Sequence, residues 1–346
     1  MLKLMRDETI GMKHGAGGPA MRHLIQTVFV NGRGAAAADD GQVLLAHMDD
    51  GAALRLGDRW LVLTTDSHVI HPIFFPGGDI GRVAVAGTVN DLAMMGATTV
   101  LALTCSVILE EGFPLERLER IQESIRATCD EAGAAIVTGD TKVMGKGEID
   151  GVVLNTTGVA LTDRVVRDRD LRPGDRILVT GTVGDHGLAI LSVRNDLGLE
   201  GDLRSDVAPL NRLIRCALDA AGDALVAMKD PTRGGLSSAL HEMAEKSGVG
   251  IVLDEGAVPV RDEVRSAGEL LGIDPLHVAN EGKAILGVRA NAAEAVLAAL
   301  RSHPLGAAAA IVGTAIGEHP RSVILDTGFG RRLLAEPEGE LLPRIC

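Results

Sequence analysis

The distribution of apolar residues along the chain predicts alternating strands and helices. Residues 60–65 (WLVLTT) and 99–107 (TVLALTCSV) are short, apolar and rich in β-branched residues, which is typical of buried strands. Between them, apolar residues recur at helical spacing over 79–95, and Gly96 follows as a candidate C-cap. A second helix is predicted over 115–132 by the same criterion. This alternation favours an α/β (α+β) protein.

A polar, charged segment divides the chain. Residues 162–175 (TDRVVRDRDLRPGD) are closed by Pro-Gly-Asp, and RILVTG at 176–181 then restarts the strand–loop–helix pattern. We therefore predict an N-terminal domain over 1–162, a C-terminal α/β domain over 170–335 and a tail over 336–346. The last ten residues (PEGELLPRIC) contain two prolines and a glycine without any period, so we expect an extended, mobile tail.

Composition narrows the class of protein. A chain of 346 residues suits two domains, and with 2% aromatic residues and no Tyr the cores must consist of Val, Leu, Ile and Ala. The net charge of −13 argues against a general nucleic-acid binder, whereas an acidic protein still binds a nucleotide if a divalent metal bridges carboxylates and phosphates. No apolar run is long enough to span a membrane, and charged residues interrupt the N-terminus where a signal peptide would be apolar. We expect a cytoplasmic location.

Four cysteines are scattered without the paired spacing of a metal site or a disulfide framework: Cys105, Cys129, Cys216 and Cys346. Cys129 is in phase with the apolar positions of the predicted helix and is expected to be buried. Cys346 differs because it is the last residue of a mobile segment. Such a thiol can visit one active site and then another, although a frayed terminus that happens to end in Cys fits the composition equally.

The first candidate motif is glycine-rich, His14-Gly15-Ala16-Gly17-Gly18. Successive backbone N–H groups in such a loop can form an anion-binding concavity. The motif is not a P-loop, because no Gly-Lys-Ser/Thr follows it. Taken alone, it fits an ordinary flexible loop better.

A set of aspartates forms the second candidate motif. They lie before a glycine, at strand ends or inside a helix: Asp49, Asp50, Asp66, Asp91 and Asp140, the last followed by Lys142. Ligands of open α/β structures gather at the carboxyl ends of strands, where carboxylates would hold Mg²⁺ against a triphosphate and Lys142 could contact a phosphate. Each aspartate taken singly is also explained as a cap or turn former. Asp91 fits that explanation least, because it lies in an apolar helix (VAGTVNDLAMMG).

Two further motifs lie in the second half. Asp230-Pro231-Thr232-Arg233-Gly234-Gly235 precedes an amphipathic helix, so Arg233 and the glycines offer an anion site at a helix N-terminus. In Asn280-Glu281-Gly282, Glu281 is a candidate base. Ordinary turn chemistry explains either motif equally well.

Together these strings resemble the HypE family of nickel–iron hydrogenase maturation proteins, in the aminoimidazole ribonucleotide synthetase-like superfamily. The resemblance runs from Gly15 to Cys346 and rests on GAGG, DDGA, TTDSHVIHPIFFPGGDIGRVAVAGTVNDLAMMGA, IVTGDTKV, DPTRGG, ANEGK and PRIC. It implies two α/β domains, dimerisation through the N-terminal domain, and binding of ATP with Mg²⁺. It further implies that the carbamoyltransferase HypF carbamoylates the terminal cysteine. The family dehydrates this thiocarboxamide to a thiocyanate with ATP and passes the cyano group to iron on the HypC–HypD complex.

The resemblance also implies residue roles. Cys346 would be the covalent carrier, Glu281 the base, and His14 a helper near the phosphate, although a structural role suits His14 at least as well. The nucleotide would be bound by Gly15, Gly17, Gly18, Asp49, Asp50, Asp66, Asp91, Asp140 and Lys142. Of these, Asp49, Asp66, Asp91 and Asp140 would hold the metal, and the choice between Asp49 and Asp50 stays open.

Two other functions compete with this one. The first is a small-molecule ATP-dependent synthetase or kinase of the same superfamily, which the aspartates do not distinguish but which needs no thiol on a tail. The second is a non-catalytic carrier in hydrogenase assembly, with Cys346 as a docking arm. Neither the hydrogenase served nor whether the tail acts within its own subunit or across a dimer follows from the sequence.

Overall fold

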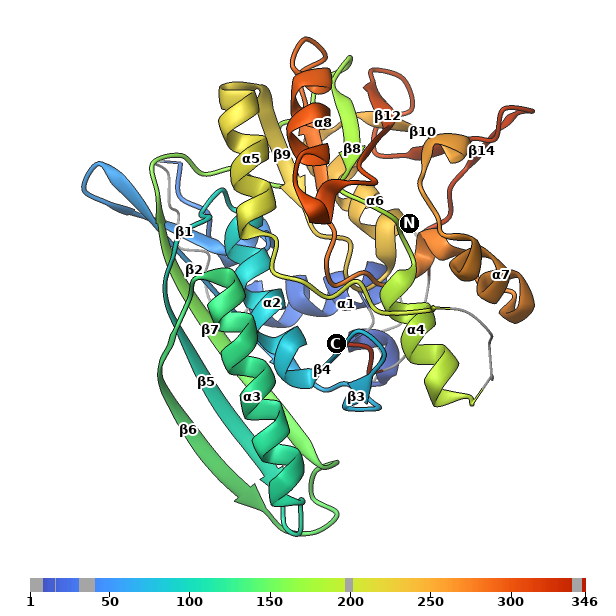
Figure 1. The fold of residues 1–346 in the computed structure, drawn as a ribbon. Helices are drawn as coiled ribbons and strands as arrows, with labels where there is room; N and C mark the ends of the chain where they lie inside the picture. Colours follow the sequence, from blue (N-terminus) through green and yellow to red (C-terminus); the bar gives the residue numbers. More distant parts are fainter. Residues whose placement is uncertain (1–8, 16, 31–40, 197–201, 338–343) are drawn as a thin grey trace.

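The computed structural model contains two β-sheets, each with its own set of helices (Figure 1). It describes residues 9–15, 17–30, 41–196, 202–337 and 344–346. The predicted α/β architecture with two domains is confirmed by this arrangement. Within the described ranges, no helix has the length and apolar character needed to cross a membrane.

The first sheet has the strand order β1-β2-β7-β5-β6. Its strands are β1 (Ala52–Leu56), β2 (Arg59–His68), β5 (Val100–Glu110), β6 (Ile136–Met144) and β7 (Val152–Thr162). β5 and β6 are parallel and the other neighbours are antiparallel. β1 and β6 are therefore the edge strands.

Helices α2 (Ile80–Met94) and α3 (Leu115–Ala132) cover one face of this sheet (Figure 1). Gly158 of β7 lies so close to α2 that an added Cβ would be 2.7 Å from Thr88 Cγ2. Because side chains alternate across a strand, the neighbours of Gly158 point to the opposite face. No helix of the described ranges covers that face, which we call the open face. Its half-buried apolar residues are Ala52, Leu54, Leu61, Leu63, Ala102, Ile108, Val153, Val159 and Leu161.

The predicted helices over 79–95 and 115–132 are confirmed as α2 and α3. Asp79 caps α2, its Oδ1 accepting a hydrogen bond from the backbone N–H of Arg82 at 3.0 Å. Gly133 ends α3 in the left-handed conformation (φ 68°) that glycine adopts without strain. The strands predicted over 60–65 and 99–107 are confirmed as parts of β2 and β5.

The position predicted for Asp140, at the end of a strand, is wrong. β6 continues to Met144 because it pairs with β5 along its whole length, from Leu103↔Ile136 to Glu110↔Met144. Asp140 and Lys142 therefore lie inside an edge strand. Sequence periodicity could not show this, since the length of β6 is set by its partner.

The second sheet has the order β14-β13-β10-β12-β8-β11-β9 and is mostly antiparallel. Its strands are β8 (Arg176–Val179), β9 (Leu225–Lys229), β10 (Gly250–Asp254), β11 (Ile285–Val288), β12 (Ala310–Ile316), β13 (Val323–Asp326) and β14 (Arg331–Leu333). Its helices are α4 (Asp185–Arg194), α5 (Asn211–Ala221), α6 (Gly235–Ser247), α7 (Asp262–Leu271) and α8 (Ala293–Arg301).

Alternating residues of this sheet belong to two different cores. Leu178 of β8 belongs to the cluster formed with α5 and α8, whereas Ile177 and Val179 belong to the cluster formed with α6. This part of the sheet is therefore buried on both faces, which accounts for its uninterrupted apolar strands.

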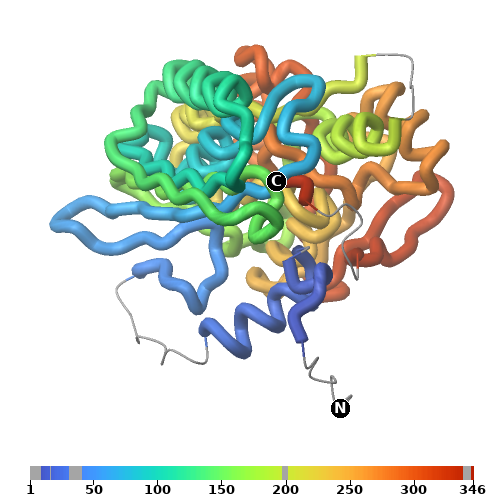
Figure 2. The backbone as a smooth tube through the Cα atoms, turned by 90° about the horizontal axis from the view of Figure 1, so that it is seen from below, coloured from blue at the N-terminus to red at the C-terminus, as the bar shows by residue number. Residues whose placement is uncertain are grey.

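Three small elements lie near the junction of the two domains. They are the helix α1 (Gly18–Leu24) and the hairpin of β3 (Phe74–Phe75) and β4 (Gly78–Asp79). Figures 1 and 2 both show the C-terminus within the outline of the molecule, beside this hairpin, whereas Figure 2 shows the N-terminus on the outside. The last residues of the chain thus return to the junction of the domains.

Candidate active site

Asp91 is the centre of a cluster of buried acids at the domain junction. It lies on α2, and its Oδ2 accepts a hydrogen bond from Thr64 Oγ1 at 2.8 Å. Burial raises the pKa of Asp91 well above its usual range, and the negative charges of Asp230, Asp66 and Asp50 raise it further. Carboxylates of both domains thus lie close together at the domain junction, where they repel one another.

Two acids of the second domain complete the cluster. Burial, followed by the charge of Asp50, raises the pKa of Asp230 to about 8. Burial also raises the pKa of Glu281 well above its usual range, with Asp230 as the next cause. Within the described residues, Glu281 Oε1 is buried and has no hydrogen-bond partner. An orphaned carboxylate oxygen of this kind is a mark of a site built for a ligand.

Lys229 supplies part of the compensating charge. Its Nζ lies 2.7 Å from Asp50 Oδ1 and 3.3 Å from Glu242 Oε2. Burial lowers the pKa of Lys229, but these acids outweigh burial and the pKa is raised overall. Asp49 still has a pKa raised to about 7, by burial and then by Asp168 and Asp50. Asp50 Oδ2 is buried without a hydrogen-bond partner in the described part of the chain, so the basic residues do not satisfy all the junction acids.

Arg233 joins the cluster to the glycine-rich N-terminal segment. The negative charge at Cys346 is the largest cause raising the pKa of Arg233. Arg233 Nη1 lies 3.3 Å from Gly15 O, and a Cβ added to Gly17 would be 2.9 Å from the carbonyl oxygen of Arg233. Gly17 and Gly18 both have positive φ (78° and 72°). The two glycine-rich motifs of the sequence are therefore in direct contact.

The end of the chain is docked beside this cluster. The Val69 N–H donates to Cys346 O at 3.0 Å, and the His71 N–H donates to Arg344 O at 3.1 Å. The side chain of Ile345 is 3% exposed. Because residues 338–343 of the predicted tail lie outside the described residues, the mobility of the tail stays a prediction.

Most of the predicted site residues meet at the junction. They are Gly15, Gly17, Asp49, Asp50, Asp66, Asp91, Glu281 and Cys346. Gly18 packs against Pro337, near the start of the tail. His14 lies next to them in sequence, and its Nδ1 is 2.9 Å from the Gly11 N–H within its own turn.

Asp140 and Lys142 are not part of this constellation. Asp140 pairs with Ser106, which itself pairs with Asn155 of β7 on the open face, so Asp140 lies on that face. Asp66 pairs with the buried Thr156 and therefore lies on the helix-covered face. Both side chains are more than half exposed, and Lys142 Nζ pairs with Asp140 Oδ2 at 2.5 Å. Within one chain these two residues therefore do not reach the other aspartates, and a role for them at the nucleotide site stays a prediction.

The sequence identified Arg233, but two lysines and one acid of the site were missed. Lys229 directly precedes the DPTRGG motif at the end of a strand, and this position could have identified it. Lys246 and Asp168, which form an ion pair near Lys229, carry no comparable signal. Asp168 lies in the charged segment taken as a domain boundary, where one acid looks like any other.

The acids fit a Mg²⁺ ion that is shared with a phosphate ligand. In the described ranges, no three side chains of His, Cys, Asp or Glu are close enough to hold an ion by themselves. Mg²⁺ commonly uses one or two carboxylates together with phosphate oxygens and waters. The orphaned Oδ2 of Asp50, with the raised pKa values of Asp91 and Asp230 beside it, matches that requirement.

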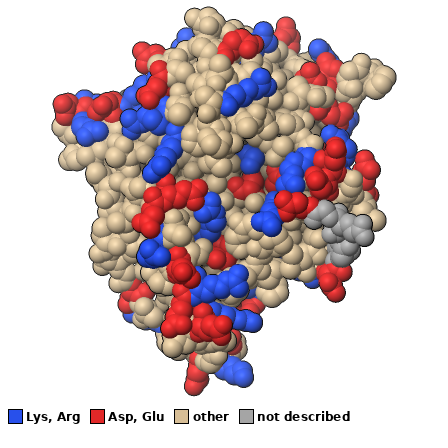
Figure 3. Space-filling view, in the orientation of Figure 1, with Lys and Arg blue, Asp and Glu red and all other residues tan. Residues whose placement is uncertain are grey.

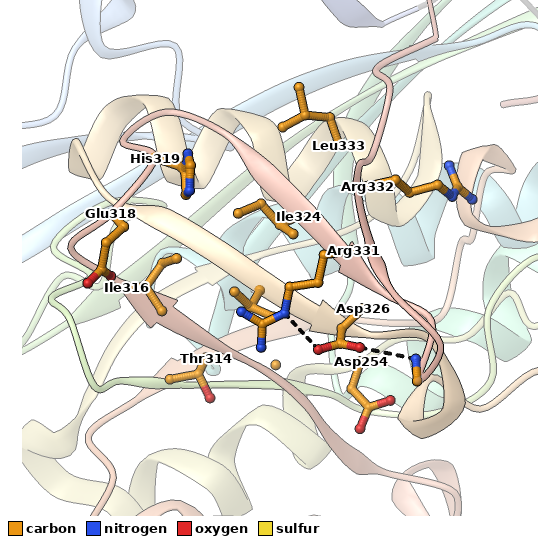
Figure 4. A pocket seen from close by; sticks show the side chains of 13 residues that line it. Asp254, Thr314, Ile316, Glu318, His319, Ile324, Asp326, Arg331, Arg332 and Leu333 are labelled. Atoms are coloured by element: carbon orange, nitrogen blue, oxygen red, sulfur yellow. Dashed lines mark hydrogen bonds and ion pairs between the residues drawn. The ribbon is translucent and has the colours of Figure 1, made fainter.

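A cavity of about 810 Å³ lies elsewhere, over β10, β12, β13 and β14 (Figure 4). Two of its acids, Asp254 and Asp326, form local hydrogen bonds. Hydrogen bonds from the Gly328 N–H and from Arg331 lower the pKa of Asp326, and Arg331 Nε lies 2.9 Å from Asp326 Oδ2. Asp254 Oδ1 accepts a hydrogen bond from the Gly256 N–H. None of the junction acids lines this cavity, so the chemistry points to the junction. On the face seen in Figure 3, basic and acidic side chains are intermixed and are not separated by sign.

Comparisons with known proteins agree with the resemblance seen in the sequence. Residues 48–162 match the AIR synthase related protein N-terminal domain, and residues 172–326 match the corresponding C-terminal domain. The carbamoyl dehydratase HypE of Azotobacter vinelandii is 48% identical over 99% of this chain and 98% of its own length. A HypE–HypF complex structure has a TM-score of 0.83 at 42% identity (91% and 99% coverage). A HypE structure in complex with ATP has a TM-score of 0.79 at 42% identity (98% and 100% coverage).

Proposed function

The chain belongs to the HypE family of AIR synthase related proteins, and we propose that it dehydrates a carbamoyl group carried on its own Cys346. The observation that carries this proposal is the docking of the terminal cysteine beside a surplus of buried carboxylates and Arg233. The reaction uses ATP and converts the S-carboxamide to an S-cyanate. It supplies the cyanide ligand for the iron of nickel–iron hydrogenase.

The chemistry explains the need for both ATP and a base. The carbamoyl oxygen is a poor leaving group, so it must first accept the terminal phosphoryl group of ATP. Loss of that oxygen as phosphate, together with both protons of the nitrogen, then forms the C≡N bond. A buried acid with a raised pKa is a stronger base once it is deprotonated. Glu281 fits this role because its Oε1 is not occupied by another hydrogen bond in the described structure.

The remaining residues bind and orient the reactants. Gly15, Gly17 and Gly18 would approach the phosphates closely, since two of them adopt backbone conformations that favour glycine. Arg233 lies where negative charge gathers, beside Cys346 and Glu281. Mg²⁺, held by Asp50, Asp66 and Asp91 with Asp49 nearby, would neutralise the phosphate charge.

We propose a homodimer joined through the open face of the first sheet. A contiguous apolar face that no helix covers commonly marks a protein–protein interface. Because Asp140 and Lys142 lie on that face, one chain cannot bring them to the acid cluster. A role for these two residues in nucleotide binding therefore requires a second copy. For His14 we propose a supporting role near the phosphate, with its Nδ1 hydrogen-bonded to Gly11 in its own turn.

HypF is the proposed partner, because a related HypE has been solved in complex with it. The HypC–HypD complex would then accept the cyano group, and this step rests on the family alone. A cytoplasmic location likewise stays a prediction. A small-molecule synthetase of the same superfamily remains the alternative, but it gives no reason for docking the last residue of the chain at the acids.

Mass spectrometry of the C-terminal peptide tests the proposal. After incubation with HypF, its carbamoyl donor and Mg-ATP, Cys346 should gain a carbamoyl mass. It should then lose one water only when the ATP is hydrolysable. Glu281→Gln should accept the carbamoyl group but fail to lose water, and Cys346→Ser should accept none. An unmodified Cys346 with a demonstrably active HypF would instead favour the small-molecule synthetase.

A further inference from the structure

The docked tail is hydrogen-bonded from two sides. Val69 and His71, which follow β2, donate their backbone N–H groups to Cys346 O and Arg344 O. The carbonyl between them belongs to Ile345 and points the other way, as in any extended segment. It is met by His186 of α4, whose Nε2 lies 2.7 Å from Ile345 O.

The geometry assigns the tautomer of His186. A carbonyl oxygen can only accept, so Nε2 must carry the proton that the hydrogen bond uses. Complete burial lowers the pKa of His186 and keeps the ring neutral, which leaves Nδ1 as an acceptor. Ser205 Oγ lies 2.7 Å from Nδ1 and therefore donates to it, while it accepts from the Val207 N–H at 3.1 Å. Ser205 thus orients the ring so that its one N–H faces the tail.

The burial of Ile345 makes this hydrogen bond important for the docked tail. Its side chain is 3% exposed, so a docked tail without His186 would leave a buried carbonyl unpaired. Arg194 of the same helix adds a donor to Arg344 O at 2.9 Å. All three terminal carbonyls therefore have a donor, and the docked register sets where Cys346 lies relative to the acids.

We propose that His186, oriented by Ser205, is a positioning residue that holds the tail in the docked register during dehydration. This inference rests on the proposed function. The tail must leave its docked position to receive a carbamoyl group from HypF, and it must return to that position for the reaction with ATP. His186 touches the backbone of Ile345 and not the reacting atoms, so it favours the docked state without taking part in the chemistry.

Thiol labelling of the unmodified protein tests the positioning directly. His186→Phe keeps an aromatic ring against Phe75 but removes the donor, and labelling of Cys346 with iodoacetamide should accelerate about tenfold. His186→Gln keeps an amide N–H near the position of Nε2 and should label close to the wild-type rate. His277→Phe is the matched control, because His277 belongs to the same domain and its Nε2 forms no hydrogen bond to residues 344–346 in the described structure.

The other cysteines report on folding in the same experiment. Cys216 is half-buried and should label equally in all variants, whereas Cys105 and Cys129 are buried and should stay unlabelled. If His186→Phe exposes Cys105 and Cys129, Ser205→Ala becomes the deciding variant, with a smaller increase in Cys346 labelling expected. Labelling of Cys346 at the wild-type rate in the folded variant, or equal rates for the Gln and Phe variants, would overturn the proposal.

Single-turnover dehydration separates this inference from the proposed function. Protein already carbamoylated at Cys346 is mixed with Mg-ATP, and the loss of water is followed. His186→Phe should lose water about tenfold more slowly, with carbamoyl transfer by HypF unchanged. If wild-type protein loses no water, the proposed function fails, whereas the labelling result still decides the positioning. If His186→Phe matches the wild type in both assays, only the positioning fails.

Discussion

At the scale of residues, the junction acids couple folding to pH. Asp230 has a folded pKa of about 8 against an ordinary value of 3.8. Between these pH values the folded protein binds more protons than the unfolded chain. The free energy of unfolding contributed by Asp230 therefore falls as pH rises from about 4 to about 8. Asp49, with a pKa raised to about 7, acts in the same direction.

Asp230→Asn should remove this decrease in the free energy of unfolding, and it should also weaken metal and nucleotide binding. At pH 8 the ligand-free variant should melt about 2–4 °C above the wild type, and at pH 4 the two should be equal. Calorimetry of both proteins at the two pH values measures the difference. Asp140→Asn is the control, because Asp140 is exposed and its pKa is lowered, first by Lys142. Equal destabilisation of Asp230→Asn at both pH values would contradict the argument.

The same scale shows what sequence could and could not tell about the site. Asp91 was identified because an acid in an apolar helix needs a partner or a ligand, and this holds in any fold. Asp140 was misplaced because sequence shows that it follows apolar residues but not which face of the sheet it occupies. Lys229 was missed although it ends a strand just before DPTRGG, and its pairing with Asp50 could not be predicted because only the approach of the domains brings the two together.

At the scale of elements, local signals predicted helices better than strands. α3 begins and ends at the residues that its helical periodicity and Gly133 predict, because both signals act within a few residues. β6 continues five residues beyond Gly139, where its apolar segment ends, since its length depends on pairing with the distant β5. The contact between the glycine-rich segment and DPTRGG likewise joins elements that are more than 200 residues apart, as the 218-residue separation of Gly15 and Arg233 shows.

Gly17→Ala tests whether this contact shapes the nucleotide site. The added Cβ would lie 2.9 Å from Arg233 O, at a φ of +78° that alanine adopts with strain. We expect about a tenfold weaker affinity for Mg-ATP, measured by isothermal titration calorimetry. Gly11→Ala is a matched control, because nothing lies within 4 Å of its added Cβ, its φ is not positive and it is not assigned to the nucleotide site. Equal losses for both variants would show that the segment needs flexibility and not this close approach.

At the scale of the molecule, the two domains are joined by buried polar groups. Asn90 of α2 donates from Nδ2 to Ala208 O at 3.1 Å, and its Oδ1 accepts from the Leu210 N–H at 2.7 Å. Lys229 and Asp50 form a buried ion pair across the same junction. Such groups are costly if they separate, so the junction keeps the acids of both domains in one arrangement.

The open face makes a prediction about assembly. Val159 lies opposite Leu63 on neighbouring strands of that face, so Val159→Glu should place a carboxylate inside a dimer interface. Sedimentation velocity should show a dimer for the wild type and a monomer for the variant. If Lys142 and Asp140 act at the site of the second copy, the monomer should also lose ATP turnover while keeping its circular dichroism spectrum.

Leu115→Glu provides the control for that experiment. It also replaces an apolar residue by glutamate, but Leu115 is 68% exposed at the start of α3, on the covered side of the sheet. An acid in the first turn of a helix is favourable, so this variant should remain a dimer with full turnover. A monomeric wild type with full turnover would exclude a catalytic role for Lys142, because a single chain keeps it on the opposite face of the sheet from Asp66.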